Sequence, residues 1–423
     1  MPHCVALAGR AIALNPGFCM TTEIKTKPSR SAVFMQKGRE HSRTVLRPVY
    51  RLLRRILRFV KWTIPALGNF LPFGRKTKRR ILVIYDTTSQ PFSVGDLLIF
   101  QEASLVLCMK HQADAVDFAI VFAPENPSAS DPVFAGTVTE DNVLFHIASL
   151  LPLAQVNQKL GSFFVFNSHE HLHHLIADNS DRYHVWPSGW GVATREYLSP
   201  IVFNDLFRGH YKEHGSIPHL SCRPFLKEWA MNFYREFVFP QVPVTINIRN
   251  NKGWHLHRNS QLNSWIDLFK YCGPRYPVKF IVICARAEID DRLRQCTNVI
   301  LAKDHHTGVE QDMALIHCSA MHMGAGSGPA TMAWFSNKPY LMVNTEYKPG
   351  EFYEHAGMIL QTEENIQQFW FAGSNQRIAK GAETPELLIK EFEFLWKSVD
   401  PEYLEKVEAD KPNGASTLQT WLR

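Results

Sequence analysis

The stretch "DMALIHCSAMHMGAGSGPATMAWFSNKPYLMVN" runs from Asp312 to Asn344 and decides the fold. A run with helical spacing, residues 310–320, leads into a short apolar strand at 321–325. A turn rich in glycine follows, and then a second helical run at 329–337 and a strand at 339–344. Strands that alternate with helices, joined by a small-residue turn, are typical of a parallel sheet covered by helices.

The same alternation extends in both directions from this stretch. The first series comprises strands at 81–86, 117–124, 162–167 and 183–189, with helices at 97–112, 141–160 (interrupted at Pro152) and 169–179. The second adds strands at 244–250, 279–285 and 298–302, and helices near 260–271, 289–296, 363–372 and 385–397. We therefore predict an α/β fold with two Rossmann-like lobes that face each other across a cleft. The expected divisions are an extension (1–80), two lobes (81–240 and 241–400) and a tail (401–423).

Composition places the chain among ordinary globular proteins. It has 423 residues, 45% of them hydrophobic and 20% charged, which suits two domains plus an extension. No apolar run reaches the roughly 18–20 residues that span a bilayer. The eight cysteines show no CxxC pair, and several lie in apolar runs, which indicates reduced thiols in the cytoplasm.

The N-terminal extension is strongly basic. Residues 25–80 hold 17 Lys and Arg against a single acid, Glu40, whereas residues 81–423 are net acidic by ten charges. Within it, apolar residues recur at helical spacing with arginines on the other side: Leu52, Leu53, Ile56, Leu57 and Val60 against Arg51, Arg54, Arg55, Arg58 and Lys61. Such a helix predicts attachment of residues 47–80 to an anionic membrane surface. A tail that is loose or docks on the body, and a nucleic-acid contact, are the alternatives; the acidic body disfavours nucleic acid.

The glycine-rich turn predicts an anion site. Gly324, Gly326 and Gly328 permit close backbone approach, Ser327 carries a hydroxyl donor, and Pro329 suits a first helical turn. A helix that begins there directs free N–H groups at an anion. A dinucleotide fingerprint places its third glycine one residue later, and the flanks of Ser327 lack the glycines of a nucleophile elbow. An ordinary strand-to-helix turn is the remaining alternative.

This stretch resembles the C-terminal lobe of GT-B-fold glycosyltransferases, including heptosyltransferase-like and fucosyltransferase-like enzymes. "VTINIRNNKGWHLHRNSQLNSWIDLF" (244–269) is also similar to a bacterial family of putative glycosyltransferases, with Arg249, Arg258 and Asn259 at the matching positions. The resemblance covers roughly 244–345 well, is weaker over 81–190 and is absent over the basic extension. It implies a nucleotide-diphosphate sugar in the second lobe and an acceptor in the first.

Residue chemistry agrees with these implied roles. Arg249 follows the first strand of the second lobe, where α/β sheets bind ligands, and a guanidinium there can clamp a diphosphate. We expect Arg258 to do the same, and Asp312 to accept from a ribose or sugar hydroxyl unless it is a structural charge. Candidate binding positions are completed by Gly95, Asn259, His306, Gly326, Ser327, Gly328 and Pro329. The alternative for Arg249 is a surface arginine that pairs with an acid, and the alternative for His306 is a place on a surface loop.

In the first lobe, "DTTSQPFSVGD" (86–96) joins a strand to a helix. Gly95 permits the turn, and Asp96 could deprotonate an acceptor hydroxyl if the reaction inverts the anomeric centre. The alternative for Asp96 is a helix N-cap.

A rival motif is "HEHLH" at 169–173, which fits H-E-x-x-H. It would place His169 and His173 around zinc with Glu170 as base. The alternative is an exposed helix on which His171 and His174 are solvated.

The function predicted from the sequence is thus a metal-independent glycosyltransferase of glycan or surface polysaccharide synthesis, peripheral at the inner face of the membrane. It needs no cofactor beyond its nucleotide-sugar donor, uses a glycan or lipid-linked acceptor and binds no nucleic acid. The alternatives are a zinc-dependent hydrolase and a non-catalytic nucleotide- or carbohydrate-binding protein.

Overall fold

The computed structural model describes residues 80–123, 138–190, 200–252, 256–348, 351–352, 357–399 and 403. The chain divides into two compact units, Met1–Arg75 and Lys76–Arg423, and all the described residues belong to the second. The predicted membrane-binding helix of the basic extension lies outside the described residues. In the described part of the chain, no helix is both long enough and apolar enough to cross a bilayer.

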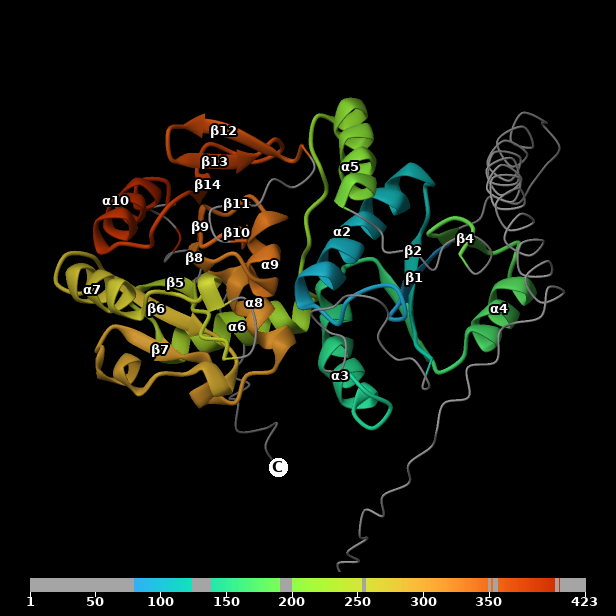
Figure 1. Ribbon diagram of the computed structural model, residues 1–423, viewed down its shortest axis with the longest axis horizontal. Coiled ribbons are helices and arrows are strands. Elements are labelled where there is room, and N and C mark those ends of the chain that lie inside the picture. Colours follow the sequence, from blue (N-terminus) through green and yellow to red (C-terminus); the bar gives the residue numbers. More distant parts are fainter. Residues whose placement is uncertain are drawn as a thin grey trace, which may run out of the picture. The chain divides into compact units, whose positions relative to one another are not determined.

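The first lobe is built on a four-stranded parallel sheet of order β3-β2-β1-β4. Its strands are β1 (Arg80–Asp86), β2 (Ala115–Val121), β3 (Leu160–Phe166) and β4 (Tyr183–Trp186). Its helices are α2 (Val94–Lys110), α3 (Val143–Leu150) and α4 (His169–Asp178), with a 3₁₀ helix, η1 (Leu151–Val156), where Pro152 interrupts the predicted helix. Alternate residues of β1 pack against α2 and α4, which cover opposite faces of the sheet (Figure 1).

Arg80 belongs to this sheet rather than to the basic extension. Its Nε lies 2.6 Å from Asp117 Oδ2, and the Tyr183 hydroxyl donates to the same oxygen over 2.7 Å. Asp117 on β2 therefore links Arg80, the first residue of β1, to Tyr183, the first residue of β4.

The second lobe contains an eight-stranded sheet of order β12-β13-β14-β9-β8-β5-β6-β7. Its strands are β5 (Val242–Asn247), β6 (Val278–Ile283), β7 (Val299–Leu301), β8 (Met321–Ala325), β9 (Tyr340–Val343), β12 (Ile359–Glu363), β13 (Ile366–Phe369) and β14 (Gln376–Ala379). The strands from β14 to β7 are parallel, and β12 and β13 are antiparallel to their neighbours. A short hairpin, β10 (Glu346–Lys348) and β11 (Glu351–Phe352), lies outside this sheet.

Helices cover both faces of the second sheet (Figure 1). One face packs against α7 (Leu262–Cys272) and α10 (Pro385–Trp396). The other packs against α8 (Val309–Cys318) and α9 (Thr331–Trp334), and α6 (Pro224–Phe237) lies beside α8. Residues of α6, α8 and α9 belong to the same buried cluster as residues of α2, α5 (Pro200–His214) and the first sheet. The two lobes therefore have a common apolar core. Burial of this core joins the lobes into one unit.

These elements confirm the predicted α/β fold with two Rossmann-like lobes. One predicted element is wrong: the helix near 363–372 is replaced by β13 and its turns. Ile366 and Phe369 face the core there, and antiparallel pairing with β12 and β14 satisfies the backbone, which overrides the helical spacing. The helix expected near 289–296 is a 3₁₀ helix, η4 (Asp291–Gln295). The six described cysteines are free thiols, as predicted.

Candidate active site

The candidate site begins where the second sheet reverses its strand order. From β5 the chain proceeds outward to β6 and β7, and then returns through α8 to β8 on the other side of β5. Ligands of open α/β sheets bind outside the carboxyl ends of the strands at such a point. Arg249 follows the end of β5, and the turn at 326–328 follows the end of β8, so both lie at this position.

Arg249 and Arg258 are brought close together by the loop between β5 and α7. Ser260 holds Arg249 through two hydrogen bonds: its Oγ accepts from Arg249 N at 3.1 Å, and its own N–H donates to Arg249 O at 2.8 Å. Arg258 Nη2 donates to the carbonyl oxygen of Gly326. Partial burial lowers the pKa of Arg249, and the positive charge of Arg258 lowers it further, partly offset by Glu288. Two guanidinium groups near each other at the end of a sheet form a site that an anion would stabilise.

The glycine-rich turn is shaped by close backbone contacts. Gly324 has φ +153°, and a Cβ there would lie 2.4 Å from Asn247 O. A Cβ on Gly326 would lie 3.0 Å from Thr345 Cγ2. The turn therefore needs glycine at 324 for conformation and space together.

Two donors predicted in this turn are used inside the protein. The Ser327 hydroxyl donates to Asn247 Oδ1, and the Gly326 N–H donates to Val343 O at 2.8 Å. The predicted helix over 329–337 is also shorter than expected: it consists of a 3₁₀ turn, η6 (Gly328–Ala330), with Pro329 in its first turn, and the four residues of α9. A helix of this length aligns few peptide dipoles. The arginines, rather than the turn, thus supply the positive charge of the site.

The first lobe meets the turn at the start of α2. A Cβ on Gly95 would lie 3.3 Å from Gly328 Cα, and one on Gly328 would lie 3.0 Å from Gly95 N and 2.9 Å from Val94 Cβ. Ser93 is the N-cap of α2, since its Oγ accepts from Asp96 N at 3.3 Å, so the N-cap alternative for Asp96 is wrong. Asp96 is partly buried in the first helical turn, next to the contact between the lobes.

The remaining predicted residues have other partners. Asn259 closes its own loop, accepting from Asn251 N at 2.9 Å and donating to Asn251 O at 2.7 Å. Both oxygens of Asp312 are engaged, by Lys303 Nζ and by the Thr307 hydroxyl, each at 2.6 Å. These contacts agree with the alternative that Asp312 is a structural charge. His306 is exposed in a left-handed conformation after β7, at the edge of the sheet.

The HEHLH residues form a packed cluster in the first lobe. His169 Nε2 lies 3.0 Å from Asp86 Oδ2, and the same oxygen accepts from Trp190 Nε1 at 3.0 Å. The rings of His169 and His173 both pack on Trp190. Glu170, His171 and His174 are exposed, as the helix alternative predicts. In the described part of the chain, no three His, Cys, Asp or Glu side chains are grouped as metal ligands.

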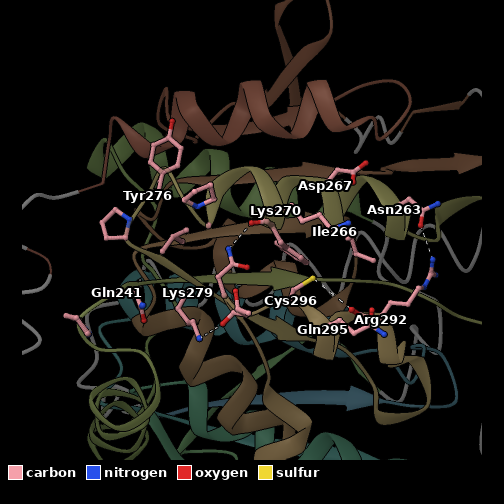
Figure 2. Close-up of a pocket in the computed structure, with 18 residues that line it drawn as sticks. Gln241, Asn263, Ile266, Asp267, Lys270, Tyr276, Lys279, Arg292, Gln295 and Cys296 are labelled. Carbon is pink, nitrogen blue, oxygen red and sulfur yellow. Dashed lines mark hydrogen bonds between the residues drawn. The ribbon is translucent and has the colours of Figure 1, made fainter.

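A large depression lies elsewhere on the second lobe (Figure 2). Its volume is about 1250 Å³, and it is lined by α7, the segment before β7 and the first residues of β6, including Lys270, Lys279 and Arg292. The beginnings of parallel strands lie at the opposite end of the sheet from Arg249. Neither arginine of the candidate site lines this depression.

Sequence reasoning missed the residues that support the arginines. Glu383 is 2% exposed and lies next to the start of α7, and Asn344 and Thr345 follow β9 beside the turn. The polar pair after β9 could have been noticed, because it follows the end of a strand. Nothing in the sequence around Glu383 indicates that it lies at the candidate site.

Comparison with known proteins gives structural likeness only. No protein-family model matches the chain, and no curated protein matches it either. Among solved structures, the glycosyl transferase family 9 protein from Veillonella parvula has a TM-score of 0.48 at 11% identity, over 77% of this chain and 99% of that one. The ADP-heptose lipopolysaccharide heptosyltransferase II of E. coli has a TM-score of 0.47 at 12% identity, over 75% and 99%.

A third structure, the fucosyltransferase NodZ from Bradyrhizobium, has a TM-score of 0.26 at 11% identity, over 62% of this chain and 94% of that one. These glycosyltransferases are solved structures to which the chain is similar at the stated identities and TM-scores. The chemistry of this chain follows from the residues of its own site.

The contact between Gly328 and α2 gives a first prediction. If the second lobe binds a nucleoside diphosphate and the first an acceptor, as the sequence predicts, Gly328→Ala should keep diphosphate binding, because the arginines are untouched. It should lower the turnover of sugar transfer by about 10-fold or more, because the new Cβ pushes the first lobe away from the turn. Binding is measured by thermal shift and turnover by product formation. Gly209→Ala is the matched control: a Cβ there meets nothing within 4 Å on α5, and alanine should stabilise the helix by about 0.5–1 kcal/mol. Unchanged turnover in Gly328→Ala would remove this contact from the mechanism.

Proposed function

We propose that the protein is a glycosyltransferase that moves a sugar from a nucleotide-diphosphate donor to an acceptor hydroxyl. The observation that carries the proposal is the pair Arg249 and Arg258 at the switch point of the second sheet, with the pKa of Arg249 lowered partly by Arg258. A diphosphate would offset the repulsion between the two positive charges, and bidentate guanidinium contacts suit it.

The chemistry follows from the position of the charges. The bond between the anomeric carbon and the outer diphosphate oxygen breaks, and its electron pair leaves with the diphosphate. The two arginines stabilise this developing charge, as fixed cations do in phosphate chemistry. The acceptor oxygen bonds to the anomeric carbon and releases its proton, to Asp96 if the configuration is inverted.

The finer parts of the proposal rest on the sequence. We place the reaction in glycan or surface polysaccharide synthesis, without a metal, and at the cytoplasmic face of a membrane that the basic residues 47–80 contact. The acceptor is a glycan or a lipid-linked intermediate. The amphipathic pattern of arginines and leucines in that extension supports the membrane contact.

A ligand screen tests the proposal. Thermal unfolding is measured with a panel of nucleoside diphosphates and their sugars, and a ligand at about 100 times its Kd should stabilise the folded protein by about 2.7 kcal/mol. The donor that raises Tm is then tested for transfer and hydrolysis. The absence of a Tm shift across the panel contradicts the proposal. A shift without transfer or hydrolysis identifies a binding protein instead of an enzyme.

A further inference from the structure

Glu383 is a buried carboxylate between three loops of the candidate site. It is 2% exposed and directly precedes Thr384, the N-cap of α10. Oε1 accepts from the indole Nε1 of Trp265 at 2.6 Å. Oε2 accepts from the backbone N–H of Gln261 and from Asn344 Nδ2, the latter at 3.1 Å. A buried charge with three donors aimed at it is held in one orientation.

One of these donors, the Gln261 N–H, leads directly to the arginine pair. Gln261 follows Ser260, which closes on Arg249 through two backbone-directed hydrogen bonds. Arg258 lies two residues before Ser260 and donates to Gly326 O. When Glu383 holds the Gln261 N–H, it therefore fixes the end of the loop that carries both arginines.

A second donor, Asn344 Nδ2, connects the same carboxylate to the turn. Asn344 Nδ2 also donates to Asn259 O at 3.3 Å, and Asn344 adopts φ +52° at the end of β9. Its neighbour Thr345 contacts Gly326, the residue whose carbonyl Arg258 binds. Glu383 thus joins the arginine loop to the turn through a single network.

We propose that Glu383 is a positioning residue of the candidate site, whose carboxylate sets residues 259–261 so that Arg249 and Arg258 face one diphosphate. This inference rests on the proposed function and names the group that organises its anion site. Glu383 acts through the loop and does not contact the ligand.

Protonation of Glu383 changes this network. Burial raises its pKa to about 7, and the three hydrogen bonds oppose that rise. The protonated acid carries an O–H donor, and one of the three donors then loses its acceptor. The charged groups on the packed elements add no resolved contribution to this pKa within the described residues; they are Arg249 and Arg258 on the loop, Asp267 and Lys270 on α7, and Glu386 on α10.

The sign of the stability effect is opposite to that of the binding effect. The pKa of Glu383 is raised on folding, so its ionisation costs stability progressively between pH 4.5 and about 7. The ionised form is nevertheless the one that accepts all three donors. Anion binding should therefore increase as pH rises through 7, while the folded protein loses a part of its stability.

Glu383→Gln tests the inference, because glutamine keeps the shape and resembles the protonated acid at every pH. Inorganic pyrophosphate is the probe, and its Kd is measured by calorimetry from pH 5.5 to 8.5. With each Kd expressed for the fully ionised form of pyrophosphate, the unmodified protein should bind about 10-fold tighter above pH 7 than below it. Glu383→Gln should lose this step and bind at pH 8 about 10-fold more weakly. Glu386→Gln, the same change at an exposed position of α10, should keep the step.

A merely structural role for Glu383 would alter Tm and leave the pH step in place, which overturns the inference. If pyrophosphate does not bind at any pH, the anion site of the proposed function fails separately. Amide hydrogen exchange then decides the positioning role without a ligand. Residues 258–261 should exchange at least 10-fold faster in Glu383→Gln at pH 8, and unchanged protection there refutes the role.

Discussion

Replacing Arg249 by alanine should lower the turnover of sugar transfer about 100- to 1000-fold, the loss seen when a group that stabilises developing charge is removed. Arg249→Lys should recover little, because an ammonium group cannot make the bidentate contact of a guanidinium. Activity with the donor found in the ligand screen is the measurement. Arg182→Ala removes an exposed arginine of the first lobe and should leave turnover unchanged.

Arg249→Ala is expected to lower activity without lowering the stability of the folded protein. The lowered pKa of Arg249 means that the folded state disfavours its charge, in part because of Arg258. Without ligand, the variant should therefore unfold at the same or a slightly higher temperature than the unmodified protein. A large decrease in Tm with a proportional loss of activity would show that Arg249 is structural.

Gly324→Ala should be the most destabilising single change in the turn. The new Cβ would lie 2.4 Å from Asn247 O and 2.7 Å from Asn247 N, and both are backbone atoms at the end of β5 that cannot move aside. The φ of +153° adds conformational strain for alanine. We expect a loss of about 3–5 kcal/mol, at the upper end for single mutations, measured by denaturant unfolding.

Gly215→Ala separates the two causes. Gly215 has φ +73°, and a Cβ there meets nothing within 4 Å, so alanine suffers the strain without the clash. Its cost should be about 1–2 kcal/mol. Equal losses in the two variants would mean that the contact with β5 does not matter, and that backbone strain alone explains both.

The sequence predicted the site where its signals were local. Strand ends can be recognised from apolar runs, so the positions of Arg249 after β5 and of the turn after β8 could be predicted, while their roles stay predictions. The position of Asp96 in the first turn of a helix after β1 could also be predicted, although the N-cap itself is Ser93. Neither prediction required knowledge of which strands are neighbours.

The missing parts depend on contacts across the chain. Glu383 lies 122 residues from Gln261 in the sequence. Its local sequence, with Thr384 and Pro385 following, is typical of a helix N-terminus and indicates no further role. The engagement of Asp312 by Lys303 and of Ser327 by Asn247 likewise depends on how loops pack, and no spacing rule reports it. The error at 363–372 has the same origin, since pairing with β12 and β14 decided that segment.

The glycine-to-glycine contact between Gly95 and Gly328 limits how the two lobes can move. With backbone already against backbone, the lobes cannot slide closer at this point. Any opening or closing of the two lobes would therefore have to be a rotation about this contact. Rotation about this contact would keep Asp96 at a nearly constant distance from the turn while parts of the two lobes farther from it move apart.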